Sequence, residues 1–224
     1  MGLPALRLSR TALAVKRSMD VLVSGAALLA LSPLLLVAAL LVRRDSPGPV
    51  FYRHVRVGKD GEKVGVFKFR TMHEEFCRGP GYGGERAEAA FAALMSDPDL
   101  REEFETNFKL EKDPRVTRVG AFLRRTSIDE LPQLLNVLRG DLSLVGPRPV
   151  TNEELPRYGG ESTTLLDVKP GLTGFWQVSG RSETTYDERV RLDLAYVTGW
   201  SLKGDISILV KTFRKVFLHR QGAF

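Results

Sequence analysis

The pattern of apolar and polar positions divides the chain into an apolar N-terminal stretch and a mixed remainder. Residues 21–42, VLVSGAALLALSPLLLVAALLV, carry no charge. At about 1.5 Å per residue, a helix over this run is about 33 Å long, enough to cross a bilayer core of about 30 Å. No small-residue cleavage site precedes the pair Arg43-Arg44, so we expect the segment to be retained.

Two features of this run bear on its topology. Ser32 and Pro33 stand at its centre, where a proline removes a backbone donor and bends a helix. Lys and Arg favour the cytoplasmic side, and they flank both ends: Arg7, Arg10, Lys16 and Arg17, then Arg43, Arg44, Arg53 and Arg56. Two interpretations remain open from these residues alone. One is a re-entrant helix that bends at Ser32-Pro33 and leaves on the face it entered, and the other is an ordinary span with a proline kink.

The remainder, residues 46–224, predicts a mostly helical α+β domain with a short β-hairpin and small strands. Residues 49–72 contain two β-rich runs around 58-GKDG-61, whose glycines and aspartate suit a tight turn. Alternation near the end of this segment places Lys68 and Arg70 on one face, where they would present two cations. An ordinary solvated face gives the same pattern.

A peripheral insertion is expected at about 74–112. Within it, residues 85–97 and 99–110 predict two acidic, alanine-rich helices broken near 97-DPD-99. The helices carry no residue pattern that indicates chemistry.

Two neighbouring carboxylates fall between two further predicted helices, one at about 117–125 and one from near 130 to Arg139. Asp129 and Glu130 would lie at the start of the second helix, where the helix dipole lowers the pKa of a carboxylate. Acids at this position most often only cap the helix. Two caps are open: a capping box that starts at Ser127, or Asp129 itself as the N-cap residue.

Arginines surround these acids along the chain. Arg124 precedes them, and 141-DLSLVGPRP-149 predicts a short strand that ends in Arg148 between two prolines. The prolines fix the local dihedral angles and thereby aim a guanidinium group suited to phosphate. A second loop, 169–182, contains Arg181. Carboxylates, aimed arginines and a membrane anchor together indicate phosphoryl chemistry at a bilayer surface.

Composition narrows the partners. A net charge of +6 and a pI near 9.6 favour nucleic acid, anionic lipid or phosphorylated substrates, but no nucleic-acid-binding motif supports the first of these. Cys77 is the one cysteine, so no internal disulfide forms, and the scattered histidines argue against zinc. Residues 203–217 predict a basic amphipathic helix whose apolar face suits an anionic membrane or the protein core, and both readings stay open.

Several long motifs, in order, carry a family resemblance. They are KFRTM at 68–72, DPRVTRVGAFLRRTSIDELPQLLNVLRGDLSLVGPRP at 113–149, KPGLTGFWQVSGRS at 169–182 and LDLAYVTGWSLKGDISILVKT at 192–212. Together these runs resemble the bacterial sugar transferases, the small monotopic polyprenyl-phosphate phosphoglycosyltransferases of the undecaprenyl-phosphate hexose-1-phosphate type. The resemblance covers roughly residues 15–217 and fits the short form of the family.

The resemblance implies a reaction and a location. It implies transfer of a sugar-1-phosphate from a UDP-sugar donor to undecaprenyl phosphate with release of UMP, through a covalent aspartyl-phosphosugar and with Mg²⁺. This is the first membrane step of exopolysaccharide, O-antigen or capsule assembly. The enzyme would sit on the bacterial inner (plasma) membrane as a monotopic protein, in contact with anionic lipid and with its catalytic domain on the cytoplasmic face. A homodimer is among the options, and nucleic acid is not an expected partner.

The resemblance also assigns residues. Asp129 would be the nucleophile, Glu130 its partner, and both are candidates for the metal. Four basic residues would bind substrate phosphates: Lys68, Arg124, Arg148 and Arg181. The Ser32-Pro33 break would make residues 1–45 a re-entrant membrane helix. The alternatives are a membrane-anchored scaffold without activity and an anion- or nucleic-acid-binding protein.

Overall fold

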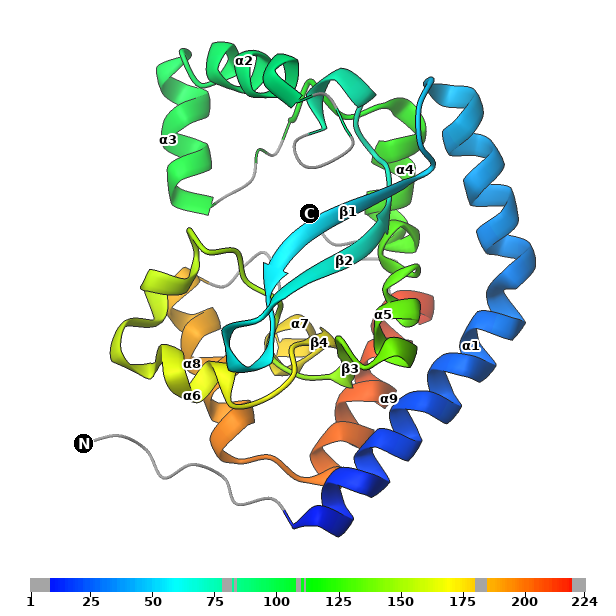
Figure 1. Cartoon of the computed structure of the whole chain (residues 1–224), viewed down its shortest axis with the longest axis vertical. Coiled ribbons are helices and arrows are strands. Elements are labelled where there is room, and N and C mark those ends of the chain that lie inside the picture. Colours follow the sequence, from blue (N-terminus) through cyan, green and yellow to red (C-terminus); the bar gives the residue numbers. More distant parts are fainter. Residues whose placement is uncertain are drawn as a thin grey trace.

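The chain folds as a long helix that lies along one side of a mixed helical and β domain (Figure 1). The computed structural model describes residues 9–77, 82, 84–107, 110, 112–179 and 185–218. Helices dominate and the strands form two small sheets, which confirms the predicted mostly helical α+β class. In chain order the elements are α1 (Arg10–Asp45), β1 (Phe51–Val57), β2 (Lys63–Phe69), α2 (Gly84–Leu94), α3 (Pro98–Asn107), α4 (Arg118–Thr126), α5 (Gln133–Arg139), β3 (Ser143–Val145), α6 (Ser162–Leu166), β4 (Gly171–Thr173), α7 (Phe175–Ser179), α8 (Tyr186–Thr198) and α9 (Leu202–Leu218).

Helix α1 contains the predicted apolar run and continues through Ser32 and Pro33 as one element, bowed along the domain in Figure 1. Pro33 has no N–H for the carbonyl of Leu29, four residues earlier, and the Ser32 hydroxyl donates to that carbonyl at 2.8 Å instead. Of the part of the chain that is described, α1 alone is long and apolar enough to cross a membrane. Most of its side chains are exposed, and its buried residues are Asp20, Ser24, Ala38 and Val42.

Both halves of α1 contact the domain. Near its start, Asp20 accepts hydrogen bonds from the Ser143 hydroxyl at 3.1 Å and from the backbone N–H of Leu144 at 2.9 Å, both in β3. Near its end, an apolar cluster joins the helix to β2 and α4 through Ala38, Val42, Phe69 and Leu123. The helix is therefore attached to the domain on either side of the Ser32-Pro33 position.

Two cations near the start of α1 reach into the domain. Lys16 Nζ pairs with the buried carboxylate of Asp205 in α9 at 2.6 Å and donates to the carbonyl of Val145 at 3.0 Å. Arg17 donates to the carbonyl of Val137 at 2.6 Å, near the end of α5, where a positive charge complements the helix dipole. From the sequence, Lys16 and Arg17 were interpreted only as charges that flank the membrane segment. In the structure they also attach α1 to the domain.

The predicted β-hairpin is confirmed. Strands β1 and β2 pair antiparallel with Arg56 opposite Val64, and the connection is a short 3-10 turn over Lys59–Gly61. Asp60 and Gly61 adopt positive φ angles of 56° and 80° there, which aspartate and glycine tolerate.

Arg70 departs from the expected pattern. Its side chain is 2% exposed, and its guanidinium donates to the carbonyl oxygens of Ser46 and Pro47 in the segment that follows α1. The prediction that Lys68 and Arg70 present two cations from one face is therefore wrong for Arg70. Its charge is used in packing, because β2 ends before it and the chain turns toward that segment.

The segment between the two predicted helices has a different form from the one expected. Helix α4 begins after Thr117, whose side chain accepts from Gly120 N–H, and it ends at Thr126, followed by Ser127 with a φ of 57°. Asp129 and Glu130 then lie in a separate 3-10 turn, Ile128–Glu130, before α5 starts. Ser127 makes no side-chain cap here, so the capping-box reading is wrong. The predicted end of α5 at Gly140 is confirmed.

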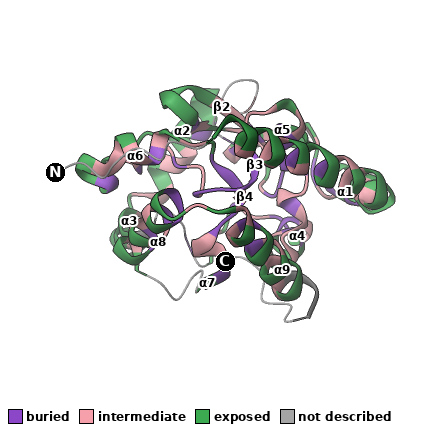
Figure 2. Cartoon of the chain, turned by 90° about the horizontal axis from the view of Figure 1, so that it is seen from below, coloured by how far each residue is buried: buried purple, intermediate pink, exposed green. Residues whose placement is uncertain are grey.

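Strands β3 and β4 form the buried centre of the domain, which Figure 2 shows in purple between the surrounding helices. They pair in parallel, with Ser143 opposite Gly171 and Val145 opposite Thr173. Leu134, Val137, Leu142, Tyr196, Val197 and Ile208 are among the side chains packed around them. The main core therefore lies directly beneath the loop that carries Arg148.

The insertion and the last helix match their predicted patterns. Helices α2 and α3 are separated near Pro98, as expected, and an edge-to-face contact of Phe91 with Phe104 holds them together. Helix α9 buries Asp205 and Ile208 on one side. Its other side exposes Ile206, Val210 and Phe213. The sequence left open whether this helix packs on the protein core or presents an apolar face to a membrane. The structure has features of both, because one face packs on the core and another remains apolar and uncovered.

Candidate active site

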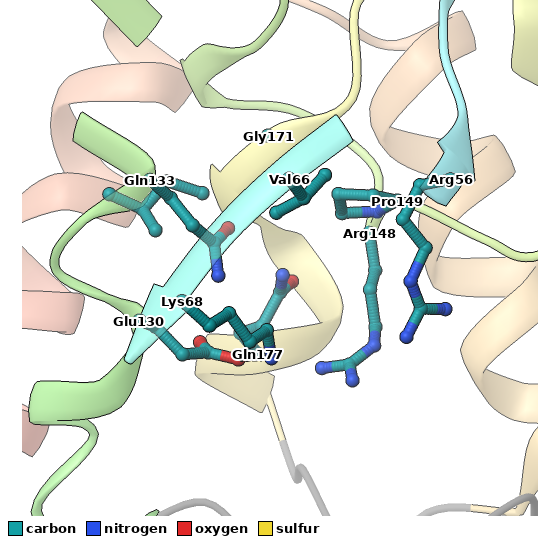
Figure 3. A pocket seen from close by; sticks show the side chains of 10 residues that line it. Arg56, Val66, Lys68, Glu130, Gln133, Arg148, Pro149, Gly171 and Gln177 are labelled. Carbon is teal, nitrogen blue, oxygen red and sulfur yellow. Dashed lines mark hydrogen bonds and ion pairs between the residues drawn. The ribbon is translucent and has the colours of Figure 1, made fainter. Parts of the chain in front are cut away.

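A pocket opens where the hairpin, the turn before α5, the loop after β3, strand β4 and helix α7 meet (Figure 3). Four polar side chains that line it come from segments far apart in the sequence. They are Arg56 from β1, Lys68 from β2, Glu130 from the 3-10 turn and Arg148 from the loop after β3. Gln133 and Gln177 complete its polar lining. The pocket therefore gathers three of the predicted site residues and one that was not predicted.

Lys68 and Glu130 form an ion pair inside this pocket. Lys68 Nζ lies 2.7 Å from Glu130 Oε1, and both side chains remain partly exposed. Asn136 fixes the approach of the two segments, because its carboxamide accepts from the backbone N–H of Phe67 and donates to the carbonyl of Gly65, each at 2.9 Å. A side chain of α5 thereby pairs with the backbone of β2 and holds Lys68 beside Glu130.

Asp129 precedes Glu130 in the same 3-10 turn and is 7% exposed. Burial raises the pKa of its carboxyl to about 6, although Lys68 and Arg124 favour the charged form; neighbouring Glu130 raises it further. The predicted lowering of this pKa by a helix dipole is therefore wrong, since the residue sits in a short 3-10 turn and loss of solvent outweighs nearby cations. The pocket lining includes Glu130 and not Asp129.

Arg124 stands on the buried side of the same turn. Its Nε donates to the Thr71 hydroxyl at 2.9 Å. Burial lowers the pKa of its guanidinium, and the charge of Asp129 opposes that shift. Asp129 is thus influenced by both Lys68 and Arg124, and Lys68 also forms the ion pair with Glu130.

Arg148 is positioned by backbone packing between the loop that follows β3 and strand β4. Gly146 N–H donates to the carbonyl of Thr173 at 2.9 Å, and Gly171 N–H donates to the carbonyl of Pro147 at 2.8 Å. A Cβ at Gly171 would collide with the backbone nitrogen of Gly146, so this contact requires glycine. The guanidinium of Arg148 lies 5.4 Å from the ring centre of Trp176, a cation–π arrangement.

Two of the predicted positions lie away from the pocket. Ser32 and Pro33 are in the middle of α1 and do not line the pocket. Arg181 lies outside the described residues.

Sequence reasoning missed a cluster of charged residues behind Arg148. Glu154 Oε2 accepts from Arg56 at 2.8 Å, and Glu154 Oε1 lies 3.4 Å from Arg189 of α8. Arg189 also lies 3.9 Å from the fully buried Asp193, which accepts from the Tyr158 hydroxyl at 2.8 Å. Arg189 and Asp193 are four residues apart on α8, a spacing that places them on one helix face. Arg56, Glu154 and Tyr158 join them only through tertiary packing, which no local pattern reveals.

The acidic side chains suit a hard cation to a limited degree. No group of three or more His, Cys, Asp or Glu side chains gathers anywhere in the described ranges. Mg²⁺ is commonly held by one or two carboxylates together with substrate phosphates, so a full protein cage is not required. Glu130 offers a carboxylate that lines the pocket next to cations able to hold those phosphates. The residues present therefore fit Mg²⁺ bound jointly with a phosphorylated substrate.

Comparisons with known proteins give the family of the chain. The family model for the bacterial sugar transferases matches residues 11–219. The chain is 47% identical over 210 residues to the undecaprenyl-phosphate galactose phosphotransferase of Salmonella typhimurium, and this match covers 94% of the chain and 42% of that protein. It is 47% identical over 205 residues to the exopolysaccharide production protein ExoY of Rhizobium meliloti, covering 92% and 86%.

A third relative is the UDP-glucose:undecaprenyl-phosphate glucose-1-phosphate transferase of Escherichia coli, 39% identical over 232 residues, with 98% of the chain and 45% of the relative covered. The chain spans less than half the length of several of its curated relatives and most of the length of ExoY. The family match extends over nearly every residue from α1 to α9, including all the segments that meet at the pocket. The chain belongs to the bacterial sugar transferase family.

Proposed function

We propose that the protein transfers a sugar-1-phosphate from a UDP-sugar to undecaprenyl phosphate and releases UMP. The observation that carries this proposal is the pocket that joins Glu130, Lys68 and Arg148 in a chain with a long apolar helix. Its cations suit a diphosphate. Relatives named as undecaprenyl-phosphate galactose and glucose-1-phosphate transferases support the donor and acceptor classes. The exopolysaccharide relative supports a role in the membrane stage of glycan assembly.

In the first proposed step Asp129 is the nucleophile. A carboxylate oxygen of Asp129 attacks the sugar-bearing phosphorus of the donor, and a new O–P bond forms. The bond from that phosphorus to the bridging oxygen of the diphosphate breaks, and UMP leaves with the bonding electrons. Lys68 and Arg148 would offset the negative charge that otherwise repels the attacking carboxylate.

In the second step a phosphate oxygen of undecaprenyl phosphate attacks the same phosphorus. The aspartyl O–P bond breaks and the carboxylate of Asp129 is restored. The low exposure of Asp129 favours this route, because a sheltered acyl phosphate is protected from hydrolysis by water.

Glu130 would hold Mg²⁺ together with the donor phosphates. The bound cation would supply charge neutralisation of the diphosphate and of the leaving UMP. Lys68, which pairs with Glu130 at 2.7 Å, would then be directed toward a phosphate oxygen of the donor.

The proposed location is the cytoplasmic face of the bacterial inner membrane, with α1 re-entrant. Residues 16–20 and 38–45 of α1 both contact the catalytic domain. A straight helix between these regions would separate them by about 35 Å, on opposite sides of a bilayer. The exposed apolar face of α9, at Ile206, Val210 and Phe213, would rest on the same membrane surface.

The test is the identity of the released nucleotide. The purified protein in detergent receives a panel of UDP-sugars, Mg²⁺ and undecaprenyl phosphate, and UMP and UDP are separated by chromatography. UMP that depends on one sugar and on the lipid is the expected result. UDP as the product would indicate ordinary glycosyl transfer. Neither product from any donor would favour a scaffold without activity.

A further inference from the structure

We propose that Arg56 is a second phosphate-binding arginine, which together with Arg148 forms a clamp for the diphosphate of a nucleoside diphosphate ligand. This inference rests on the proposed function and assigns the donor diphosphate to a pair of residues. Arg56 lies in β1, and Arg148 follows β3, so the pair exists only in the folded domain. Both line the same pocket, and in Figure 3 their side chains extend in the same direction.

The first argument is that the fold brings the positive charges of Arg56 and Arg148 close together. Burial lowers the pKa of Arg56 to about 10; Glu154 opposes this shift, while Arg148 and Arg189 add to it. Glu154 is the carboxylate bonded to Arg56 and Arg189, and in the described part of the chain Arg148 forms no ion pair. A pocket that keeps guanidinium groups together at an electrostatic cost is suited to an anion that binds between them.

The second argument is that Arg56 is held and still has donors to offer. Its Nη1 donates to Glu154 at 2.8 Å, and its Nη2 lies 3.2 Å from His54 Nδ1. These contacts engage part of the donor fork of a guanidinium group and fix its plane. Thr151 N–H donates to Glu154 Oε2 at 2.7 Å, so Glu154 is itself anchored. Glu154 therefore acts as a positioning residue for Arg56.

The third argument concerns the number of phosphates. Lys68 and Glu130 lie in the pocket with the two arginines, and each guanidinium can bind one phosphate group through paired N–H donors. Two arginines thus match a diphosphate better than a single phosphate. We accordingly assign Arg56 to the donor and not to the lipid phosphate.

The test compares UDP and UMP binding by isothermal titration calorimetry with Mg²⁺ present. The unaltered protein should bind UDP more tightly than UMP. Arg56→Ala should weaken UDP binding by about 10- to 100-fold, the usual effect of a lost charged hydrogen bond, and should change UMP binding much less. Arg56→Lys should restore part of the loss, since it keeps the charge without the fork. Glu154→Gln should weaken UDP binding in the same direction.

The matched control is Arg53→Ala, which removes a cation from the opposite face of β1, where Arg53 is exposed against Phe67. It should bind UDP like the unaltered protein. Equal UDP binding by Arg56→Ala and Arg53→Ala, with both folded by circular dichroism, would overturn the clamp. If Arg56→Ala raises only the KM for undecaprenyl phosphate, the arginine serves the acceptor and the donor assignment is wrong. Because calorimetry requires no turnover, failure of the clamp is distinguishable from failure of the proposed transfer reaction.

Discussion

Lys68 and Glu130 face each other across 2.7 Å in the pocket, although 62 positions separate them in the chain. The contact joins the hairpin to the turn that also contains Asp129, and Asn136 secures the same junction from α5. The acidic and basic halves of the site are therefore held together by direct bonds between the hairpin and the turn–α5 segment.

Replacement of Lys68 should impair transfer more than stability. Lys68→Met keeps most of the length of the side chain and removes the charge that pairs with Glu130 and that, in the proposed reaction, would face the donor phosphates. We expect the initial rate of UMP release to fall by about 100-fold or more, because a preorganised charge at a phosphoryl centre contributes on that order. Lys63→Met, at an exposed position of the same strand, is the control and should retain activity. Equal rates for the two variants would remove Lys68 from the site.

The nucleophile can be identified by trapping the adduct. The protein is incubated with donor and Mg²⁺ but without acceptor, and intact-mass spectrometry detects the added phosphosugar. Asp129→Asn should give no adduct and should lower transfer by about 1000-fold or more, since an amide is not an effective nucleophile toward phosphorus. Asp167→Asn, an exposed aspartate, should form the adduct normally. An adduct that maps to Glu130, the carboxylate that lines the pocket, would reassign the nucleophile.

The close contact between Gly146, just after β3, and Gly171 of β4 should limit substitution there. Gly171→Ala places a Cβ against the backbone nitrogen of Gly146, and that backbone has no room to move beside β3. We expect destabilisation of about 1–3 kcal/mol, seen as a fall in Tm of several degrees in differential scanning fluorimetry. Gly160→Ala meets no atom within 4 Å and serves as the control. A Tm for Gly171→Ala equal to that of the control would contradict the contact.

Stability should depend on the protonation of Asp193. Burial raises the pKa of this carboxyl to about 6, from 3.8 as its ordinary value, so between these pH values the folded state binds more protons than the unfolded state. The contribution of Asp193 to the free energy of unfolding is therefore largest below pH 4 and falls as pH rises to 6, by about 3 kcal/mol. Asp193→Asn should flatten this part of the pH dependence.

The measurement for this prediction is Tm between pH 4 and pH 7. Only the difference between variants is diagnostic, because Asp129 also has a raised pKa and contributes in the same direction. Asp187→Asn, an exposed position on the same helix, should leave the curve unchanged. If Tm depends on pH in the same way in the unaltered protein and in Asp193→Asn, the pKa of Asp193 is not raised by burial and the prediction is wrong.

The local sequence pattern predicted the helices and strands correctly in most places. It did not predict the properties of residues at which distant segments of the chain meet. The hairpin, the helix that ends at Gly140 and the broken insertion follow from turn residues, caps and periodicity, which neighbouring residues determine. A lowered pKa was predicted for Asp129 and an outward-facing charge for Arg70, and both predictions were wrong. Both properties depend on which distant segments pack over the side chain. The pair of Arg56 and Glu154 joins positions 98 residues apart, which no local pattern reveals.

Attachment of α1 at both ends restricts how the domain can move relative to its anchor. A domain on a flexible tether samples many heights and tilts above a bilayer, whereas bonds from Asp20 to β3 and packing of Val42 against α4 and β2 fix this one. With α1 seated in the membrane, the pocket keeps one depth and one orientation. In the proposed reaction, a lipid-linked phosphate confined to the headgroup plane would then reach the site by lateral diffusion in two dimensions.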